Sequence, residues 1–122
     1  MRALIVDDSR PIRRIEAGIL HELGFETCDA ANGNEALRLM ESSPRPDLVL
    51  VDWNMPEMNG LEFVRAVRKN RDFAGVVLVM VTTETEMEQM SRALSAGADE
   101  YLMKPFQRDA LVEKLRLVGV IA

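Results

Sequence analysis

Leu48-Val-Leu-Val51 is an unbroken run of aliphatic residues that ends at an acidic side chain, Asp52. Runs of this kind, without polar alternation, are typical of strands covered on both faces in a parallel sheet. Similar runs lie on either side of it in the chain, at residues 3–6 and 76–81, and weaker ones at residues 25–30 and 100–103. The sequence therefore predicts five short strands.

Segments with helical periodicity separate these strands. Apolar residues three or four positions apart mark five helices. The apolar positions are Ile12, Ile15, Ile19, Leu20 and Leu23; Ala36, Leu37 and Met40; Leu61, Val64 and Val67; Met87, Met90 and Leu94; and Leu111, Leu115 and Val118. Gly24, Gly97 and Gly119 follow three of the helices, as glycine commonly does.

Two residue pairs mark helix starts. Asn59 with Glu62, and Thr83 with Glu86, have the spacing of a capping box. Strands and helices thus alternate as five βα units, and right-handed crossovers place helices on both faces of one sheet. We expect an α/β fold with an open, doubly wound parallel sheet, in a single domain over residues 1–122 with no effector domain.

Composition limits the classes of function. The chain has 122 residues, with 15 Lys and Arg against 20 Asp and Glu and a net charge of −5. This acidic balance argues against a nucleic-acid partner, which needs clustered basic residues. No apolar run approaches the roughly 20 residues of a membrane helix, and the N-terminus is too short in apolar residues for a signal peptide. We expect a cytoplasmic protein that does not bind membranes.

A few residues are expected to have structural roles only. The single cysteine, Cys28, lies in a predicted strand and is expected to be buried, in a reducing compartment. The basic pairs at residues 13–14 and 68–69 are expected on solvated helix faces. His21 falls within the first helix and is expected at the surface.

Polar side chains collect where the strands end. Asp7 and Asp8 follow the first strand, Asp52 ends the third, and Thr82 and Lys104 follow the fourth and fifth. Ligands bind at the carboxyl ends of the strands in such sheets, so we expect these side chains to lie together. Three carboxylates would repel one another unless a cation intervened, and oxygen ligands without histidine or thiolate favour Mg²⁺.

Mg²⁺ beside a carboxylate is suited to phosphoryl transfer. The metal neutralises charge while an aspartate acts as nucleophile and forms an aspartyl phosphate. Lys104 would pair with a phosphoryl oxygen, and the Thr82 hydroxyl would donate a hydrogen bond to another.

Four motifs in order resemble the receiver domain of response regulators, the stand-alone chemotaxis regulators in particular. They are Leu-Ile-Val-Asp-Asp-Ser at residues 4–9, Leu-Val-Asp-Trp-Asn-Met-Pro-Glu-Met-Asn-Gly at 50–60, Val-Thr-Thr-Glu at 81–84 and Lys-Pro-Phe at 104–106. The resemblance covers essentially the whole chain. It implies a flavodoxin-like fold with strand order 2-1-3-4-5.

The resemblance also implies the role of each site residue. Asp52 matches the phosphoacceptor. Asp7 and Asp8 match the acidic pair that holds Mg²⁺ together with Asp52, and the backbone carbonyl of Asn54 matches a further ligand. Lys104 matches the lysine that contacts the phosphoryl group, and the bond from it to the following proline is commonly cis in the family.

Further matches concern the switch and its lifetime. Thr82 matches the hydroxyl that moves toward the phosphoryl group, and Tyr101 matches the aromatic residue whose rotamer follows it. Strand alternation places Tyr101 on the opposite face from Lys104, which suits an output surface. Asn54 and Glu84 match positions that tune dephosphorylation, and their identities predict a short-lived phosphorylated state. Trp53 is expected to report Mg²⁺ binding through its fluorescence.

The function implied is that of a monomeric two-component signalling switch rather than an enzyme that turns over a substrate. A histidine kinase or phosphotransfer protein would phosphorylate it, and a downstream protein would read the surface formed by residues 87–94, 100–103 and 111–118. The resemblance implies chemotaxis as the pathway. The chemotaxis regulators are basic at the start of the fourth helix, whereas this chain has Glu86 and Met87 there, which counts against the flagellar motor as the target. A phosphate sink and a relay intermediate remain alternatives.

Two readings from other classes are disfavoured. A haloacid-dehalogenase-type phosphatase needs two aspartates one residue apart after the first strand, whereas Asp7 and Asp8 are adjacent. A flavodoxin-like cofactor binder must cradle a phosphate in its first loop, where these two carboxylates would repel it.

Overall fold

Five parallel strands form one sheet in the computed structural model, which describes residues 1–42, 44–83 and 87–122. The strand order is β2-β1-β3-β4-β5, so the order implied by the family resemblance is confirmed. The strands are β1 (Arg2–Val6), β2 (Glu26–Ala30), β3 (Leu48–Asp52), β4 (Val77–Thr82) and β5 (Glu100–Met103). All five residues of β3 are buried, as its unbroken apolar run predicts.

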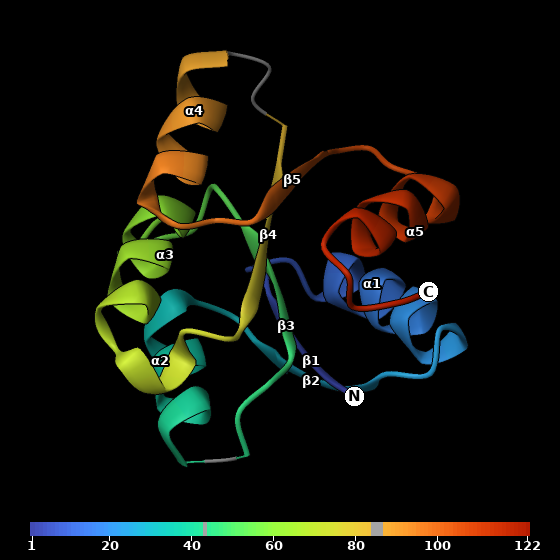
Figure 1. The fold of residues 1–122 in the computed structure, drawn as a ribbon, viewed down its shortest axis with the longest axis horizontal. Helices are drawn as coiled ribbons and strands as arrows, with labels where there is room; N and C mark the ends of the chain where they lie inside the picture. Colours follow the sequence, from blue (N-terminus) through green and yellow to red (C-terminus); the bar gives the residue numbers. More distant parts are fainter. Residues whose placement is uncertain (43, 84–86) are drawn as a thin grey trace.

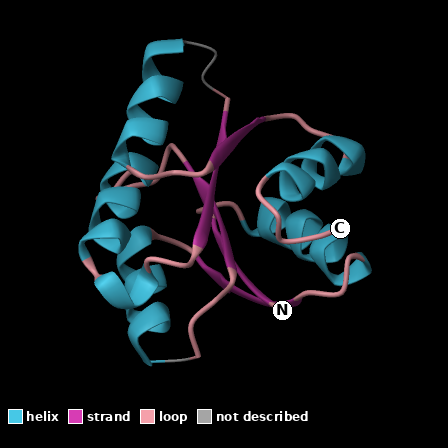
Figure 2. Cartoon of the chain, viewed as in Figure 1, coloured by secondary structure: helices cyan, strands magenta, loops and turns pink. Residues whose placement is uncertain are grey.

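Helices cover both faces of the sheet (Figures 1 and 2). On one face lie α1 (Arg10–Glu22) and α5 (Arg108–Leu117), and on the other lie α2 (Gly33–Ser42), α3 (Gly60–Lys69) and α4 (Met87–Ala96). A short 3₁₀ turn, Arg71–Phe73, precedes β4. The sheet therefore separates two apolar clusters, one centred on Phe63 of α3 and the other on Leu20, Leu111 and Leu115 of α1 and α5. No helix among the described residues has the length and apolar character needed to cross a bilayer.

The predicted start of α3 is confirmed. The Asn59 side chain accepts a hydrogen bond from the Glu62 amide at 2.9 Å, and the Glu62 carboxylate accepts one from the Asn59 amide at 3.1 Å. Both halves of the capping box are thus present. The equivalent prediction for α4 depends on Glu86, which lies outside the described residues.

The prediction that the basic pairs are simply solvated is wrong for their first members. The side chains of Arg13 and Arg68 are only 14% and 20% exposed. Arg13 donates to one backbone carbonyl and Arg68 to three, and each also donates to a carboxylate, as described below. Helical spacing alone did not show that these two side chains reach backbone carbonyls of neighbouring segments.

The prediction that Cys28 is buried is also wrong. Its side chain is exposed on β2, which is an edge strand of the sheet. His21 is exposed, as expected, and its ring nitrogen is 2.8 Å from the Thr27 hydroxyl.

Candidate functional site

Strand register brings the polar strand ends together. Val6 pairs with Val51, Asp52 with Val81, and Thr82 with Met103, so the residues that follow these pairs meet at one edge of the sheet. The Lys104 amide donates to the Thr82 carbonyl at 2.8 Å, which carries the ladder one step beyond β5.

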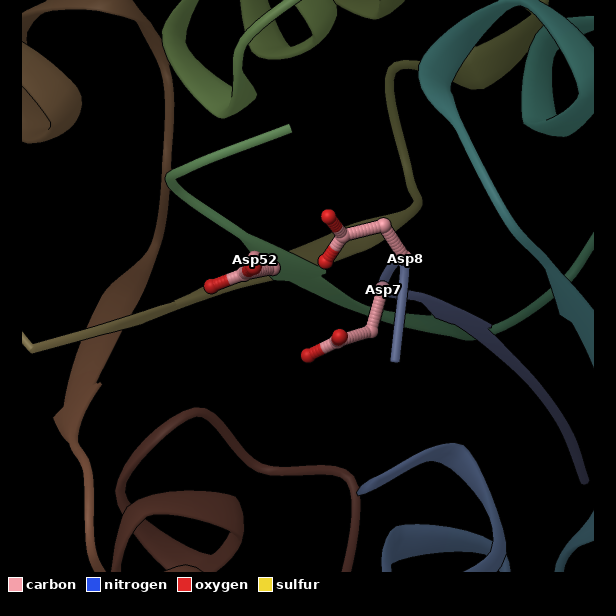
Figure 3. A group of neighbouring side chains, drawn as sticks. All are labelled: Asp7, Asp8 and Asp52. Carbon is pink, nitrogen blue, oxygen red and sulfur yellow. The ribbon is translucent and has the colours of Figure 1, made fainter. Parts of the chain in front are cut away.

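Three carboxyl groups converge at this edge (Figure 3). Asp7, Asp8 and Asp52 each offer an oxygen, and these oxygens lie within 4.8 Å of one another. Asp7 and Asp52 are 1% and 8% exposed, whereas Asp8 is exposed. We call these three residues the acidic trio. Two of its members are buried like charges, which is an unfavourable arrangement for folding alone.

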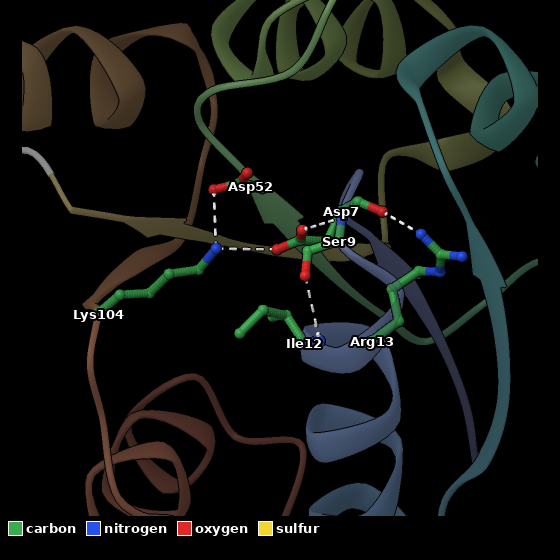
Figure 4. A network of polar contacts seen from close by, with 6 residues as sticks. All are labelled: Asp7, Ser9, Ile12, Arg13, Asp52 and Lys104. Atoms are coloured by element: carbon green, nitrogen blue, oxygen red, sulfur yellow. Dashed lines mark hydrogen bonds and ion pairs between the residues drawn. The ribbon is translucent and has the colours of Figure 1, made fainter.

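One lysine pairs with two members of the trio (Figure 4). The Lys104 ammonium lies 2.9 Å from Asp7 Oδ2 and 3.2 Å from Asp52 Oδ1. The Lys104–Pro105 peptide bond is cis, as the resemblance implies. Within the described residues, one ammonium group is thus hydrogen-bonded to two of the three carboxylates of the acidic trio.

The electrostatic surroundings shift the pKa of two site residues. Burial raises the pKa of the Asp52 carboxyl, and the positive charge of Lys104 opposes that rise. The charges of Asp7 and Asp8 raise the pKa of Asp52 further. Burial lowers the pKa of Lys104, but its hydrogen bonds and the charges of Asp7 and Asp52 outweigh burial and raise it. The site thus favours a charged ammonium and gains from additional positive charge.

The loop after β1 is held by its own side chains. Asp7 Oδ1 accepts a hydrogen bond from the Ser9 amide at 2.8 Å, and the Ser9 hydroxyl caps α1 by accepting from the Ile12 amide at 3.4 Å. Arg13 donates to the Asp7 carbonyl and to the Asp29 carboxylate, both at 2.7 Å. Sequence reasoning missed Ser9 and Arg13. Ser9 could have been found, because a serine two residues before a proline is a common helix start.

Gly60 allows α3 to pack against the end of β3. A Cβ at this position would lie 2.6 Å from the Asp52 carbonyl oxygen and 2.8 Å from Met80 Sδ. The Gly60 amide also donates to the Trp53 carbonyl at 2.9 Å. A larger residue would push the helix away from the strand that carries Asp52.

Comparison with known proteins agrees with this geometry. Residues 3–116 match the family model of the response regulator receiver domain. The chain belongs to this family. It is 40% identical to the chemotaxis protein CheY1 of Helicobacter pylori over 97% of this chain and 96% of that protein, and 39% identical to the CheY of Pseudomonas aeruginosa over 97% and 95%. The solved structure of Vibrio cholerae CheY4 matches with a TM-score of 0.89 and 38% identity, covering 96% and 97% of the two chains.

Receiver domains bind Mg²⁺ at an acidic pocket, and the acidic trio could hold such an ion. The trio offers only oxygen ligands, which Mg²⁺ prefers at about 2.0–2.1 Å. Its oxygens are already gathered within 4.8 Å, so side-chain rotation would bring them onto one ion. The residues present therefore fit the metal.

The receiver residues expected to act as a switch lie next to one another. Thr82 is 2% exposed at the end of β4. It lines a small crevice with Trp53, Met90 and Tyr101, between β4, β5 and α4. Tyr101 packs against the core cluster of α2, α3 and α4, while the Lys114 ammonium lies 4.5 Å from its ring centroid. Tyr101 thus contacts both helices beside β5.

The two residues expected to tune dephosphorylation are Asn54 and Glu84. Asn54 is exposed in the loop two residues beyond Asp52, and the role of its carbonyl as a ligand stays a prediction. Glu84 lies outside the described residues.

A fourth carboxyl group near the trio was missed from sequence. Glu16 of α1 is 2% exposed, and burial, followed by the charge of Asp7, raises its pKa to about 8. Its spacing from Ile12 and Leu20, four residues each way, was the available signal, because it places a charged residue on the apolar face of the helix.

Proposed function

We propose that this receiver domain is a phosphorylation-activated two-component switch in which Asp52 accepts a phosphoryl group with the help of Mg²⁺. The observation that carries the proposal is the acidic trio with Lys104 hydrogen-bonded to two of its members. Such a group of like charges contributes little to folding, and it is what phosphoryl transfer needs.

Asp7, Asp8, Asp52 and the carbonyl of Asn54 would hold the metal. When bound, the ion supplies positive charge that offsets the repulsion between the carboxylates and the incoming phosphoryl oxygens. An Asp52 oxygen then forms a bond to phosphorus as the bond from phosphorus to the donor's leaving atom breaks. Lys104, already 3.2 Å from Asp52 Oδ1, is placed to pair with a phosphoryl oxygen. Catalysis is mostly positioning and charge neutralisation.

The donor is a histidine kinase, a phosphotransfer protein or a small acyl phosphate. The partner has to approach the sheet edge that carries Asp52. An apolar rim borders that edge, where Ile15 of α1 is 60% exposed beside Phe106. The protein assists its own phosphorylation and dephosphorylation, and no turnover of a separate substrate is expected.

Phosphorylation signals through a shift in conformation. The modified aspartate carries close to two negative charges at neutral pH, by analogy with other phosphorylated side chains. This charge draws the Thr82 hydroxyl, and the crevice that Thr82 shares with Tyr101 links the site to the α4–β5–α5 surface. A downstream protein reads that surface. We propose that residues 1–122 act as one monomeric domain in the cytoplasm, within chemotaxis signalling, and that nucleic acid is not a partner.

Incubation with acetyl phosphate and Mg²⁺ tests the proposal. Intact mass spectrometry should show the addition of one phosphoryl group to the wild type and none to Asp52→Asn. Asp72→Asn, which changes an exposed carboxylate in the turn before β4, away from the site, is the matched control and should be labelled as the wild type is. Equal labelling of Asp52→Asn would contradict the assignment of Asp52 as the phosphoacceptor. Steady hydrolysis of a phosphate ester would favour the phosphatase alternative.

A further inference from the structure

Glu16 is a buried carboxyl group without a visible structural task. It is 2% exposed on α1, and in the described part of the chain its Oε2 atom has no hydrogen-bond partner. A buried polar atom that lacks a partner is destabilising by about 1–3 kcal/mol. An apolar residue at this position would avoid that loss, so the carboxyl group calls for a functional explanation.

Glu16 lies beside the lysine of the site. Glu16 and Lys104 line the same pocket of about 340 Å³, between α1 and the segment after β5. The other lining residues are Ile12, Ile15, Thr83, Pro105 and Phe106, most of them apolar. The charges that act on Glu16 are those of Asp7, Lys104 and Asp52, which lie just after β1, just after β5 and at the end of β3. Among the described residues, Lys104 is therefore the cation that shares a pocket with this carboxyl group and whose charge acts on it.

Lys104 and a divalent cation would compete for the same oxygens. The ammonium is 2.9 Å from Asp7 and 3.2 Å from Asp52, and both carboxylates belong to the acidic trio. A dication among the trio repels the ammonium and takes its acceptors. The Lys104 side chain is only 17% exposed, so the displaced ammonium needs another acceptor nearby.

We propose that Glu16 is a positioning residue that receives the Lys104 ammonium when Mg²⁺ occupies the acidic trio, and so keeps this lysine at the edge of the site until a phosphoryl oxygen arrives. The inference rests on the proposed Mg²⁺-dependent function. It does not depend on one protonation state, because a carboxylic acid and a carboxylate both present an acceptor oxygen. The pairing also gives the unpartnered Oε2 atom a donor.

Mg²⁺ affinity measured by calorimetry tests the pairing. A hydrogen bond to a charged group changes an equilibrium constant by about tenfold or more, so Glu16→Met should weaken Mg²⁺ binding by about tenfold. Glu16→Gln keeps an acceptor oxygen and should stay within about threefold of the wild type. In a Lys104→Met background, Glu16→Met should change the affinity by less than about twofold, since no ammonium remains to be received.

A second readout follows the lysine itself. The ¹⁵N signal of the Lys104 ammonium should shift on addition of Mg²⁺ in the wild type and in Glu16→Gln, and broaden by exchange with water in Glu16→Met. This measurement keeps the test available if one variant folds poorly.

The outcomes separate the two proposals. Equal Mg²⁺ affinity in the wild type and Glu16→Met, or a loss that persists in the Lys104→Met background, would overturn the role of Glu16 and leave the proposed function intact. No Mg²⁺ binding by the wild type would overturn both.

Discussion

Charged groups are arranged in opposite ways at the two ends of the sheet. At the amino end of β4 and β5, one arginine satisfies several acceptors. Arg68 donates to the carbonyls of Gly97, Phe73 and Val76 at 2.9, 3.0 and 2.8 Å, and to the Asp99 carboxylate at 3.0 Å. Asp99 also accepts from the Leu78 amide at 2.8 Å. Every partner there is a group of opposite polarity.

At the carboxyl end, like charges are gathered instead. Asp7, Asp8 and Asp52 lie together, Lys104 pairs with the first and last of them, and Glu16 is buried nearby. The same parallel strands support both ends, so the difference arises from which side chains the strand ends, helices and loops place there. The amino end stabilises the fold, whereas the carboxyl end holds an unfavourable arrangement of like charges that a bound cation would relieve.

The largest effect is expected at the amino end. Arg68→Met should lower the free energy of unfolding by about 3–4 kcal/mol, because three carbonyls and the Asp99 carboxylate lose their donor together. Urea denaturation measures the change. Lys69→Met, at the exposed neighbouring position, is the matched control and should change stability by less than about 0.5 kcal/mol. Equal effects of the two substitutions would show that Arg68 does not have this role.

A pH-dependent effect of nearly the same size is expected at Glu16. The free carboxyl titrates near 4.5 and the folded one near 8, so between these values the folded protein holds a proton that the unfolded chain lacks. Raising the pH through this window therefore lowers the stability of the wild type. Glu16→Gln should avoid the loss and, relative to the wild type, become more stable by about 3–4 kcal/mol between pH 5 and pH 8.

Thermal and urea unfolding across this pH range would detect the change. Glu22→Gln is the control, since Glu22 lies on the same helix but is exposed, and its curve should run parallel to that of the wild type. A difference between wild type and Glu16→Gln that does not vary with pH would contradict the buried, proton-holding carboxyl.

Much of the fold and the site's composition could be predicted from local patterns. Apolar runs located the strands within about one residue at each end, because buried parallel strands leave no room for polar positions. Asp7, Asp8, Asp52 and Lys104 were predicted to meet because parallel strand ends share one edge. The strand order and the cis bond came from the family resemblance, since neither leaves a local signal.

The features that were missed depend on tertiary contacts. Arg13 and Arg68 have the composition of surface residues, and only the folded loops show the carbonyls that they reach. Cys28 was misplaced because its burial was expected from its place in a strand, although the implied strand order already puts β2 at the edge of the sheet. Glu16 was overlooked because one charged residue in an amphipathic helix is a weak signal until burial is known.

The smallest effect concerns the acidic trio. It tests the comparison directly, because replacing an aspartate by asparagine should change the free energy of unfolding in opposite directions at the two ends of the sheet. In the presence of a chelator, Asp52→Asn should raise the free energy of unfolding by roughly 1 kcal/mol, since it removes a buried charge that lies within 4.8 Å of two others. Asp99→Asn should lower stability by a similar or smaller amount, because Asp99 pairs with Arg68 and is partly exposed. Adding Mg²⁺ should then stabilise the wild type more than Asp52→Asn, since a ligand that binds the folded state stabilises it in proportion to its affinity. Urea midpoints with and without Mg²⁺ measure all three changes, and a loss of stability in Asp52→Asn would mean that the pair with Lys104 outweighs the repulsion within the trio.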